Sequence, residues 1–401
     1  MRAVVFNSGH DIRVEHVSAP VIDLPDDIIV RVTAAALGGV DLHIYRGQIS
    51  GLKERDVLGR EFMGIVEEAG PAVSAVKVGD RVAVPSVIAC GKCFFCRRKL
   101  YSACEISNFD RSTLMNEKVI RSGAAFFGYG HFHGGLPGGQ AELVRVPRAN
   151  SGPLALPEQV SDDQAIFLSD ALPTAYQAAI NAAIRPGDTL VIFGAGPIGQ
   201  LCAACARAMD VGRIYMVDRH DYLLRFASDN YDVIPINFCS SATERFVVEH
   251  TGYRGADCVI DAVGFEAGGS PLETALAAVK LEGGSSKVLR HAIATVRRGG
   301  HISVAGTYQG LLHGFPFGEI FEKNITLRAG RTNVQEHLPT LLDWILEKKI
   351  RPEIIVSHHL DLEEAPRAYN MANGHLDERR KIVLVPGLNE RSGKGAPASE
   401  Q

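Results

Sequence analysis

The chain has 401 residues, of which 46% are hydrophobic and 22% are charged, and its formal net charge is −4. This composition is typical of a globular protein, and the small negative charge gives no electrostatic reason to expect nucleic acid or an anionic membrane as a partner. A chain of this length exceeds one ordinary hydrophobic core, so we expect two domains. We find neither an apolar stretch of about 20 residues nor a signal-peptide pattern, and we expect a cytoplasmic protein.

Residues 1 to about 150 predict a β-rich domain. Short apolar or alternating runs are separated by turn signals such as Val78-Gly79-Asp80, and none of them has helical periodicity. The runs that we expect to form strands are residues 28–32, 63–67, 81–84 and 141–146.

Four of the eight cysteines lie close together in this part, in the pattern Cys90-x2-Cys93-x2-Cys96-x7-Cys104. Such a cluster in a long chain indicates a metal site rather than a disulfide framework. Four thiolates can surround one zinc ion at about 2.3 Å each, which leaves no coordination position open to a substrate. We therefore expect one structural zinc ion here.

From about residue 180 to residue 330 the chain alternates between apolar strand patterns and helical patterns. This alternation predicts a parallel sheet covered by helices. The six expected strands are residues 189–193, 214–217, 233–236, 258–262, 302–305 and 325–328. Beyond them we expect helices at 336–349 and 362–373, a strand at 381–385 that returns to the first domain, and disorder in the polar tail 387–401.

A glycine motif, Gly194, Gly196 and Gly199, follows the first of these strands. Gly194 permits a sharp turn, Gly196 lets the backbone approach a pyrophosphate, and Gly199 lets a helix pack close to the strand. The N-terminus of that helix then offers N–H groups to the phosphates. Asp218 ends the next strand, where it can accept hydrogen bonds from an adenine ribose and repel a 2′-phosphate. The motif predicts NAD rather than NADP, although Arg219 could accommodate a 2′-phosphate.

Eight segments are informative when they are taken together: GGVDLHIYRG, VLGREFMGIVEE, VGDRVAVP, FFGYGHFHGGLPGGQAELVRVP, FLSDALPTAYQA, GAGPIG, DAVG and RAGRTNVQ. With the cysteine cluster, they make residues 1–386 resemble the medium-chain, zinc-containing alcohol dehydrogenases, most of all the glutathione-independent formaldehyde dehydrogenase branch. The resemblance implies an α/β fold, with a GroES-like β-barrel catalytic domain at 1–155 and 336–386. The Rossmann domain, a doubly wound parallel sheet, would span 156–335. Family members assemble as dimers or tetramers, so we expect a homo-oligomer.

The resemblance also exposes a departure at the catalytic zinc. Members of the family bind this ion with a Cys in a C-G-[ST]-D-x-H segment, a His in a G-H-E segment and an Asp in an S-D segment. The corresponding residues here are Gly38, Arg60 and Asp170, and Val40 replaces the hydroxyl residue. Gly38 has no donor side chain, and a permanently protonated arginine cannot bind a cation. We therefore expect no catalytic zinc.

Arg60 and Asp170 together have the same net charge as the catalytic zinc site of the family. Zinc with one thiolate, one carboxylate and a neutral histidine sums to about zero, and so does an arginine with an aspartate. A buried pair of this kind is stable only with good bidentate geometry, which a planar guanidinium can provide. Glu61 is the competing partner of Arg60, but neighbouring residues on a strand point apart, so we prefer Asp170.

Histidines add further candidates. His43 occupies the position of the family's proton-relay histidine, and a proton role and a purely structural role for it are equally open. With Glu61, Asp170 and a histidine of the insert it could instead build a different metal site. The insert, residues 106–139, resembles the loop that buries the cofactor in formaldehyde dehydrogenases and dismutases. Its aromatic residues and His131 are weaker candidates for the substrate site, because aromatic clusters usually serve packing.

The resemblance implies additional contacts to the cofactor. They are Pro197 and Ile198 beside the pyrophosphate, Val263 against the adenosine or the nicotinamide, Gly306 and Thr307 near the nicotinamide, and Gly330, Arg331 and Thr332 closing over it. Arg331 stands where this branch often has Gln, and together with Arg60 it could attract an anionic substrate.

These features predict an NAD(H)-dependent oxidoreductase that acts on a small molecule and has a structural zinc only. Without a Lewis acid, ordinary alcohol oxidation should be very slow. Three mechanisms remain open. Arg60 could polarise a carbonyl or carboxylate while His43 moves the proton, hydride could pass to or from an imine or activated alkene, or tightly bound NAD could be recycled within one turnover. The alternative from another class is a non-catalytic NAD(H)-binding protein used for sensing or assembly.

Overall fold

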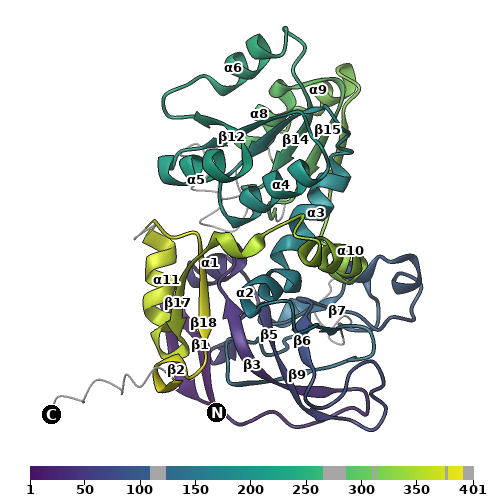
Figure 1. Ribbon diagram of the computed structural model, residues 1–401, viewed down its shortest axis with the longest axis vertical. Coiled ribbons are helices and arrows are strands. Elements are labelled where there is room, and N and C mark those ends of the chain that lie inside the picture. Colours follow the sequence, from purple (N-terminus) through teal and green to yellow (C-terminus); the bar gives the residue numbers. More distant parts are fainter. Residues whose placement is uncertain (109–122, 265–285, 309–311, 313, 375–377, 392–401) are drawn as a thin grey trace, which may run out of the picture. The chain divides into compact units, whose positions relative to one another are not determined.

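The computed structural model describes residues 1–108, 123–264, 286–308, 312, 314–374 and 378–391, and all statements below refer to these (Figure 1). It divides into two compact units: unit 1 consists of Met1–Pro173 and Thr332–Gln401, and unit 2 of Thr174–Arg331. This division differs from the expected one at 155/156 and 335/336. The first boundary lies later because the turn Ile166–Ser169 packs against strands of unit 1. Among the described residues, none of the helices combines the length and apolar character that crossing a membrane requires.

Unit 1 is built mainly from β-strands. They are β1 (Arg2–Ser8), β2 (Asp11–His16), β3 (Ile28–Ala36), β4 (Asp56–Val57), β5 (Glu61–Ala69), β6 (Arg81–Val84), β7 (Val87–Ile88), β8 (Ala125–Phe126), β9 (Leu143–Val146), β10 (Leu154–Ala155), β17 (Val356–Asp361) and β18 (Lys381–Val385). The largest sheet has the order β10-β6-β5-β3-β18-β17, and β9 also pairs with β3. Smaller sheets have the orders β2-β1-β4 and β7-β8. Strand β18 pairs with β3, so the prediction that the last strand returns to the first domain is confirmed.

Apolar side chains of these strands form the core of unit 1. Val30, Val32, Phe62, Val82 and Phe127 are all buried within one cluster. Strand β3 is buried along most of its length because it has sheet neighbours on both sides and a covered face. This rigid centre positions β5 and β18, whose first residues belong to the candidate site.

Unit 1 also contains helices and 3-10 turns, most of them short. They are α1 (Gly39–Tyr45), α2 (Asp162–Ala165), α10 (Val334–Leu346), α11 (Ala365–Gly374) and α12 (Leu388–Arg391), with 3-10 turns η1 (Cys96–Arg98), η2 (Tyr101–Ala103), η4 (His131–His133), η5 (Ile166–Ser169), η7 (Pro352–Ile355) and η8 (Leu362–Glu364). The sequence predicted no helix in the first 150 residues, and this prediction was wrong because α1 lies there. Five of the seven residues of α1 are buried, so its sequence has no single apolar stripe. The expected disorder from 387 onward is wrong at its start, where α12 forms, and 392–401 lie outside the described residues.

Unit 2 is a parallel sheet with the order β13-β12-β11-β14-β15-β16, which is the order of a doubly wound sheet. The family resemblance implies this fold class. Its strands are β11 (Thr189–Phe193), β12 (Arg213–Asp218), β13 (Ile234–Asn237), β14 (Ala256–Asp261), β15 (Val296–Val304) and β16 (Thr326–Ala329). Its helices are α4 (Pro197–Ala208), α5 (Asp221–Tyr231), α6 (Thr243–His250), α8 (Lys287–Thr295) and α9 (Phe317–Glu322), and α3 (Ala171–Asn181) crosses from unit 1. Helix α5 packs against β12 and β13, and α8 packs against β14 and β15. All six predicted strands are present, although β15 begins earlier than expected, in a polar segment without a strand pattern.

Candidate active site

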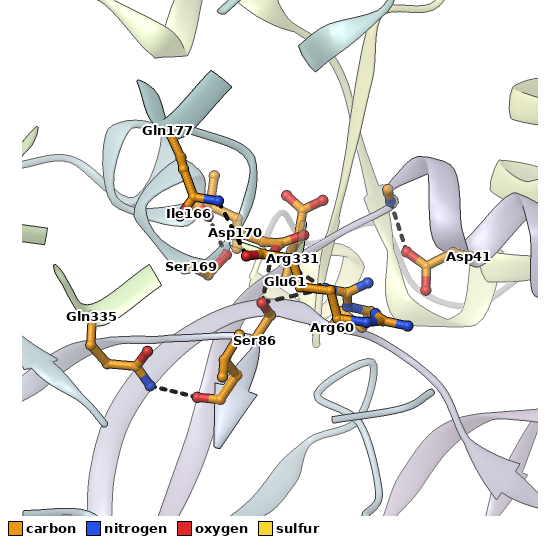
Figure 2. Close-up of polar contacts among 12 residues, drawn as sticks. Asp41, Arg60, Glu61, Ser86, Ile166, Ser169, Asp170, Gln177, Arg331 and Gln335 are labelled. Carbon is orange, nitrogen blue, oxygen red and sulfur yellow. Dashed lines mark hydrogen bonds and ion pairs between the residues drawn. The ribbon is translucent and has the colours of Figure 1, made fainter. Parts of the chain in front are cut away.

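Arg60, Ser86 and Asp170 meet in unit 1, where three separate segments come together (Figure 2). Arg60 directly precedes β5, Ser86 precedes β7, and Asp170 follows η5. The Arg60 Nη2 atom lies 3.3 Å from Asp170 Oδ1, and the Ser86 hydroxyl donates a hydrogen bond of 2.5 Å to the same oxygen. The structure therefore pairs Arg60 with Asp170, as we expected. The pair uses one nitrogen and one oxygen, so the expected bidentate geometry is not present.

Two aromatic rings complete the surroundings of Arg60. The guanidinium carbon lies 5.1 Å from the centroid of Phe126 and 5.1 Å from that of Tyr129. Arg60 is only 8% exposed, and cation–π attraction is stronger where water is excluded. Both rings belong to the insert that the sequence singled out, of which residues 109–122 lie outside the described residues. The rings hold the guanidinium in place where the single contact to Asp170 would leave it loose.

Glu61 has a different partner, which the sequence did not reveal. Both carboxylate oxygens of Glu61 accept hydrogen bonds from Lys381 Nζ, at 2.8 and 2.7 Å. Glu61 is 4% exposed and Lys381 is 1% exposed. Burial raises the pKa of Glu61, and the attraction to Lys381 opposes this effect. A lysine at the start of the apolar strand KIVLV was the available signal, since a buried lysine needs a partner.

Asp41 lies buried on α1 beside these pairs. Its Oδ2 atom accepts a hydrogen bond of 2.7 Å from the backbone N–H of Gly38, while Oδ1 has no hydrogen-bond partner among the described residues. Burial, together with repulsion from Glu61, raises the pKa of Asp41 to about 7. When Asp41 carries a proton, the charges of Arg60, Lys381, Glu61 and Asp170 cancel. In that protonation state the cluster is neutral without a metal ion.

The histidine candidates occupy other positions. His43 is buried on α1, with Nδ1 3.1 Å from Gln48 Oε1. His131 Nε2 lies 3.1 Å from Asp56 Oδ1. The alternative metal site is not formed, because the described residues contain a single group of three or more His, Cys, Asp or Glu side chains that could hold an ion, and it is the cysteine cluster.

The four cysteines of that cluster converge as predicted. Their Sγ atoms all lie within 4.8 Å of one another, and the Cys90–Cys96 and Cys93–Cys104 distances are both 4.0 Å. A tetrahedral zinc site with bonds of about 2.3 Å places its sulfur atoms roughly 3.8 Å apart. The backbone N–H of Cys93 donates to Cys90 Sγ at 3.3 Å, which stabilises a thiolate. The residues fit a structural zinc ion, and the closed set leaves no position for a substrate.

The glycine loop lies at the carboxyl end of β11 in unit 2. Gly194 has a φ of +97°, which favours glycine, and a Cβ on Gly199 would lie 1.9 Å from the Gly194 carbonyl oxygen. Helix α4 begins at Pro197, with Gly196 as its N-cap and Ile198 in its first turn. A Cβ on Gly196 would meet no protein atom within 4 Å. The protein itself therefore needs glycine at 194 and 199, whereas the space beside Gly196 is open.

Asp218 supports this loop from the end of β12. Its Oδ2 atom accepts a hydrogen bond of 2.7 Å from the backbone N–H of Ala195. Its Oδ1 atom accepts hydrogen bonds from the N–H groups of Arg219 and His220, at 2.7 and 2.9 Å. The carboxylate thus fixes the backbone around the expected cofactor position, a role that sequence reasoning missed.

The remaining cofactor candidates form two groups. Gly306 and Thr307 pack tightly against Gly264, which follows Val263 in the chain. A Cβ on Gly306 would lie only 2.1 Å from the backbone nitrogen of Gly264. The Arg331 carbonyl accepts a hydrogen bond of 3.1 Å from Gln177 Nε2 (Figure 2). The boundary between the two units falls within the expected segment Gly330–Thr332: Gly330 and Arg331 belong to unit 2, and Thr332 belongs to unit 1.

The two units define a class of protein in which a parallel dinucleotide-type sheet is joined to a β-unit that carries a thiolate cluster. Residues 24–157 match the alcohol dehydrogenase GroES-like domain. The chain is 37% identical over 388 residues to an uncharacterized zinc-type alcohol dehydrogenase-like protein, AdhB, of Bacillus subtilis, covering 96% of this chain and 100% of the relative. It is 31% identical over 399 residues to the formaldehyde dismutase of Pseudomonas putida, covering 92% and 94% of the two chains.

Among solved structures, alcohol dehydrogenase TADH from Thermus sp. ATN1 superimposes with a TM-score of 0.83 at 35% identity, covering 96% of this chain and 100% of that one. The chain therefore belongs to the zinc-type alcohol dehydrogenase family and is an oxidoreductase of that type. The resemblance and the fold class inferred from the sequence are confirmed.

Proposed function

We propose that this protein is an NAD(H)-dependent oxidoreductase that transfers hydride to or from a small carbonyl, imine or activated alkene without a catalytic zinc ion. The observation that carries the proposal is the buried Arg60 guanidinium, 3.3 Å from Asp170. The two residues stand at family positions that would hold zinc. The Arg60 guanidinium keeps a positive charge where the family would hold zinc. This substitution favours an altered but working active site over simple loss of function. The small-molecule substrate and assembly into dimers or tetramers belong to this proposal.

The cofactor side of the proposal rests on the glycine loop. The open space beside Gly196 suits a pyrophosphate, and the first N–H groups of α4 are donors for its oxygens. The Asp218 carboxylate favours NAD over NADP because it would repel a 2′-phosphate. When bound, the nicotinamide supplies or accepts the hydride. The cysteine cluster would hold the structural zinc.

Arg60 is the proposed oxygen-binding group. Its contacts to Asp170 and Ser86 both use Nη2, and its buried Nε has no hydrogen-bond partner among the described residues. Unused N–H groups in a buried place can donate to a carbonyl or carboxylate oxygen and stabilise negative charge that develops on it. Asp170 and the two aromatic rings orient the guanidinium for this role.

His43 is the proposed proton donor or acceptor. A carboxamide oxygen only accepts hydrogen bonds, so the contact to Gln48 Oε1 supports the tautomer of His43 with its proton on Nδ1. In the neutral imidazole, Nε2 is then the basic nitrogen.

A zinc and nucleotide count on the purified protein tests the proposal first. We expect one zinc ion per chain together with NAD, and two zinc ions would overturn the role of Arg60. Turnover is then followed by NADH absorbance against aldehydes, imines and enones. Tight NAD binding without hydride transfer to any class would instead support the non-catalytic alternative.

Variants make the role of Arg60 specific. Arg60→Lys keeps the charge but loses the planar fork, so we expect kcat/KM to fall by about 100-fold or more. The matched control is Arg13→Lys, since Arg13 is an exposed arginine 2.7 Å from Asp11. Equal activity of the two variants would contradict the proposal.

A further inference from the structure

A basic cavity of about 680 Å³ lies in unit 2, at the edge of the sheet opposite the glycine loop. Thr189, at the amino end of β11, lines this cavity, whereas Gly194 follows the carboxyl end of the same strand. A strand of this length separates its two ends by roughly 15 Å. The cavity is therefore distinct from the expected dinucleotide site. We call it the arginine cavity, after Arg213, Arg254 and Arg297.

The arginine cavity carries an excess of positive charge. Asp257 is the single acidic residue among those that line it, and Arg297 Nε donates to its Oδ1 at 2.6 Å. Asp257 Oδ2 also accepts the backbone N–H of Thr189 at 2.9 Å. The Arg297–Asp257 pair is thus neutral. Arg213 and Arg254 leave two positive charges without a counter-charge among the lining residues.

Hydrogen-bond donors remain available in the cavity. Arg213 uses Nη1 for the Tyr215 hydroxyl at 3.3 Å and the His250 carbonyl at 3.0 Å, which leaves Nε and Nη2. The Arg254 side chain is exposed, and its guanidinium makes no hydrogen bond or ion pair with the described residues, although the backbone N–H donates to the Thr251 carbonyl at 3.4 Å. The N–H donors of the guanidinium are therefore available to a ligand. Guanidinium groups bind phosphate oxygens through parallel N–H donors.

Two glycines, Gly187 and Gly252, line the cavity. Their φ angles of +83° and +61° favour glycine, and a Cβ on either would meet no atom within 4 Å, so both walls border open space. The volume falls in the range of small-molecule sites, about 300–1,000 Å³, and exceeds what one phosphate ion fills. Charge, donors and size together point to a phosphorylated small molecule.

We propose that the arginine cavity binds the phosphate or diphosphate group of a small molecule, at a second site that operates independently of the dinucleotide loop. Arg213 and Arg254 supply the unpaired charge, and Arg297 is held in position by Asp257. Both inorganic pyrophosphate and a nucleotide such as ATP carry the required group, so the experiment includes both.

The test is a thermal-unfolding titration of the full-length protein with pyrophosphate or with ATP, in the presence of saturating NAD. NAD occupies the dinucleotide loop, so a saturable rise in Tm then reports a second site. We expect such a rise, and we expect it to weaken at higher salt. If ATP raises Tm at much lower concentration than pyrophosphate, the cavity takes a nucleotide; the reverse order assigns it to inorganic diphosphate. No saturable rise with either probe would overturn the proposal.

Two substitutions localise the binding. Arg254→Gln removes a guanidinium that supports no other described residue, so it should fold normally and weaken the anion's affinity about tenfold or more. The matched control is Arg245→Gln, which removes an exposed arginine of α6 that lies 2.7 Å from Glu249. The control should bind as tightly as the parent protein. If the two substitutions weaken binding equally, the anion responds only to net charge, and the cavity is not its site.

Discussion

The Glu61 carboxylate lies where a side chain on residue 38 would have to be: a Cβ on Gly38 would come within 2.6 Å of Glu61 Oε1. On its other side the carboxylate is held by Lys381, at 2.7 and 2.8 Å. Gly38 has a φ of −104°, which any residue can adopt, so glycine is required here by space and not by backbone conformation. The glycine at residue 38 and the buried Glu61–Lys381 pair are therefore compatible parts of one arrangement.

Gly38→Ala should destabilise the protein for this reason. The new methyl group must displace a buried, paired carboxylate, and we expect the free energy of unfolding to fall by about 1–3 kcal/mol. Gly39→Ala is the control, because a Cβ there would meet nothing within 4 Å and lies in α1, where alanine is favourable. Urea unfolding measures both variants. Equal stability would show that Glu61 moves without cost.

Gly38→Cys combined with Arg60→His restores the residue types that the family uses with Asp170. We expect a second zinc ion per chain, bound more weakly than the first because the new side chain must displace Glu61. Elemental analysis after dialysis measures the content. Each single substitution supplies at most two of the three ligands and should stay at one zinc ion. A double variant that also stays at one would mean that the site has diverged further than its residue types indicate.

Lys381→Met leaves the Glu61 carboxylate buried and unpaired. We expect the free energy of unfolding to fall by about 3–5 kcal/mol, and the added substitution Glu61→Gln to recover much of the loss. The control is Lys99→Met, which breaks an exposed ion pair of 2.9 Å to Glu336 and should change little. If Lys381→Met were as mild as the control, the pair would not be the strong buried interaction that its distances indicate.

Asp41 should make stability depend on pH. Its folded-state pKa of about 7 lies above its ordinary value of 3.8, so the folded protein keeps a proton that the unfolded chain releases. Its contribution is complete below about pH 4 and is lost as the pH rises to about 7. From pH 5 to pH 8 the loss should amount to roughly 2–3 kcal/mol. Asp41→Asn should abolish this part of the dependence, whereas Asp229→Asn, at an exposed position on α5, should retain it. Parallel curves for the parent protein and Asp41→Asn would contradict the assignment.

Cys104→Ser should remove the structural zinc. Three thiolates bind the ion less tightly than four, and the binding free energy of such a site contributes to folding. We expect zinc content to fall well below one per chain, with a lower Tm. Cys239→Ser, at an exposed cysteine outside the cluster, should keep both unchanged. Full zinc content in Cys104→Ser would exclude this residue as a ligand.

The sequence was most informative where local chemistry has a fixed spacing. The glycine motif, the six strands of unit 2 and the cysteine cluster all depend on residues that are near one another in the chain, and the structure forms each of them. Helix α1 escaped prediction, because burial all round erases the apolar stripe that identifies a surface helix.

The sequence by itself determined the family and the position of the expected cofactor loop, and it is the basis of the proposed zinc-ligand replacement at Gly38 and Arg60. Only the tertiary structure decided which charges meet. Lys381 is 320 residues from Glu61 in the chain, yet the strand order places β5 and β18 on either side of β3, and the two side chains meet. In the same way Ser86 and two aromatic rings join Arg60 and Asp170. The fold determines the partner of each buried charge. A charge removed from water is costly unless it is paired, and the available partners are the groups that the tertiary structure places next to it.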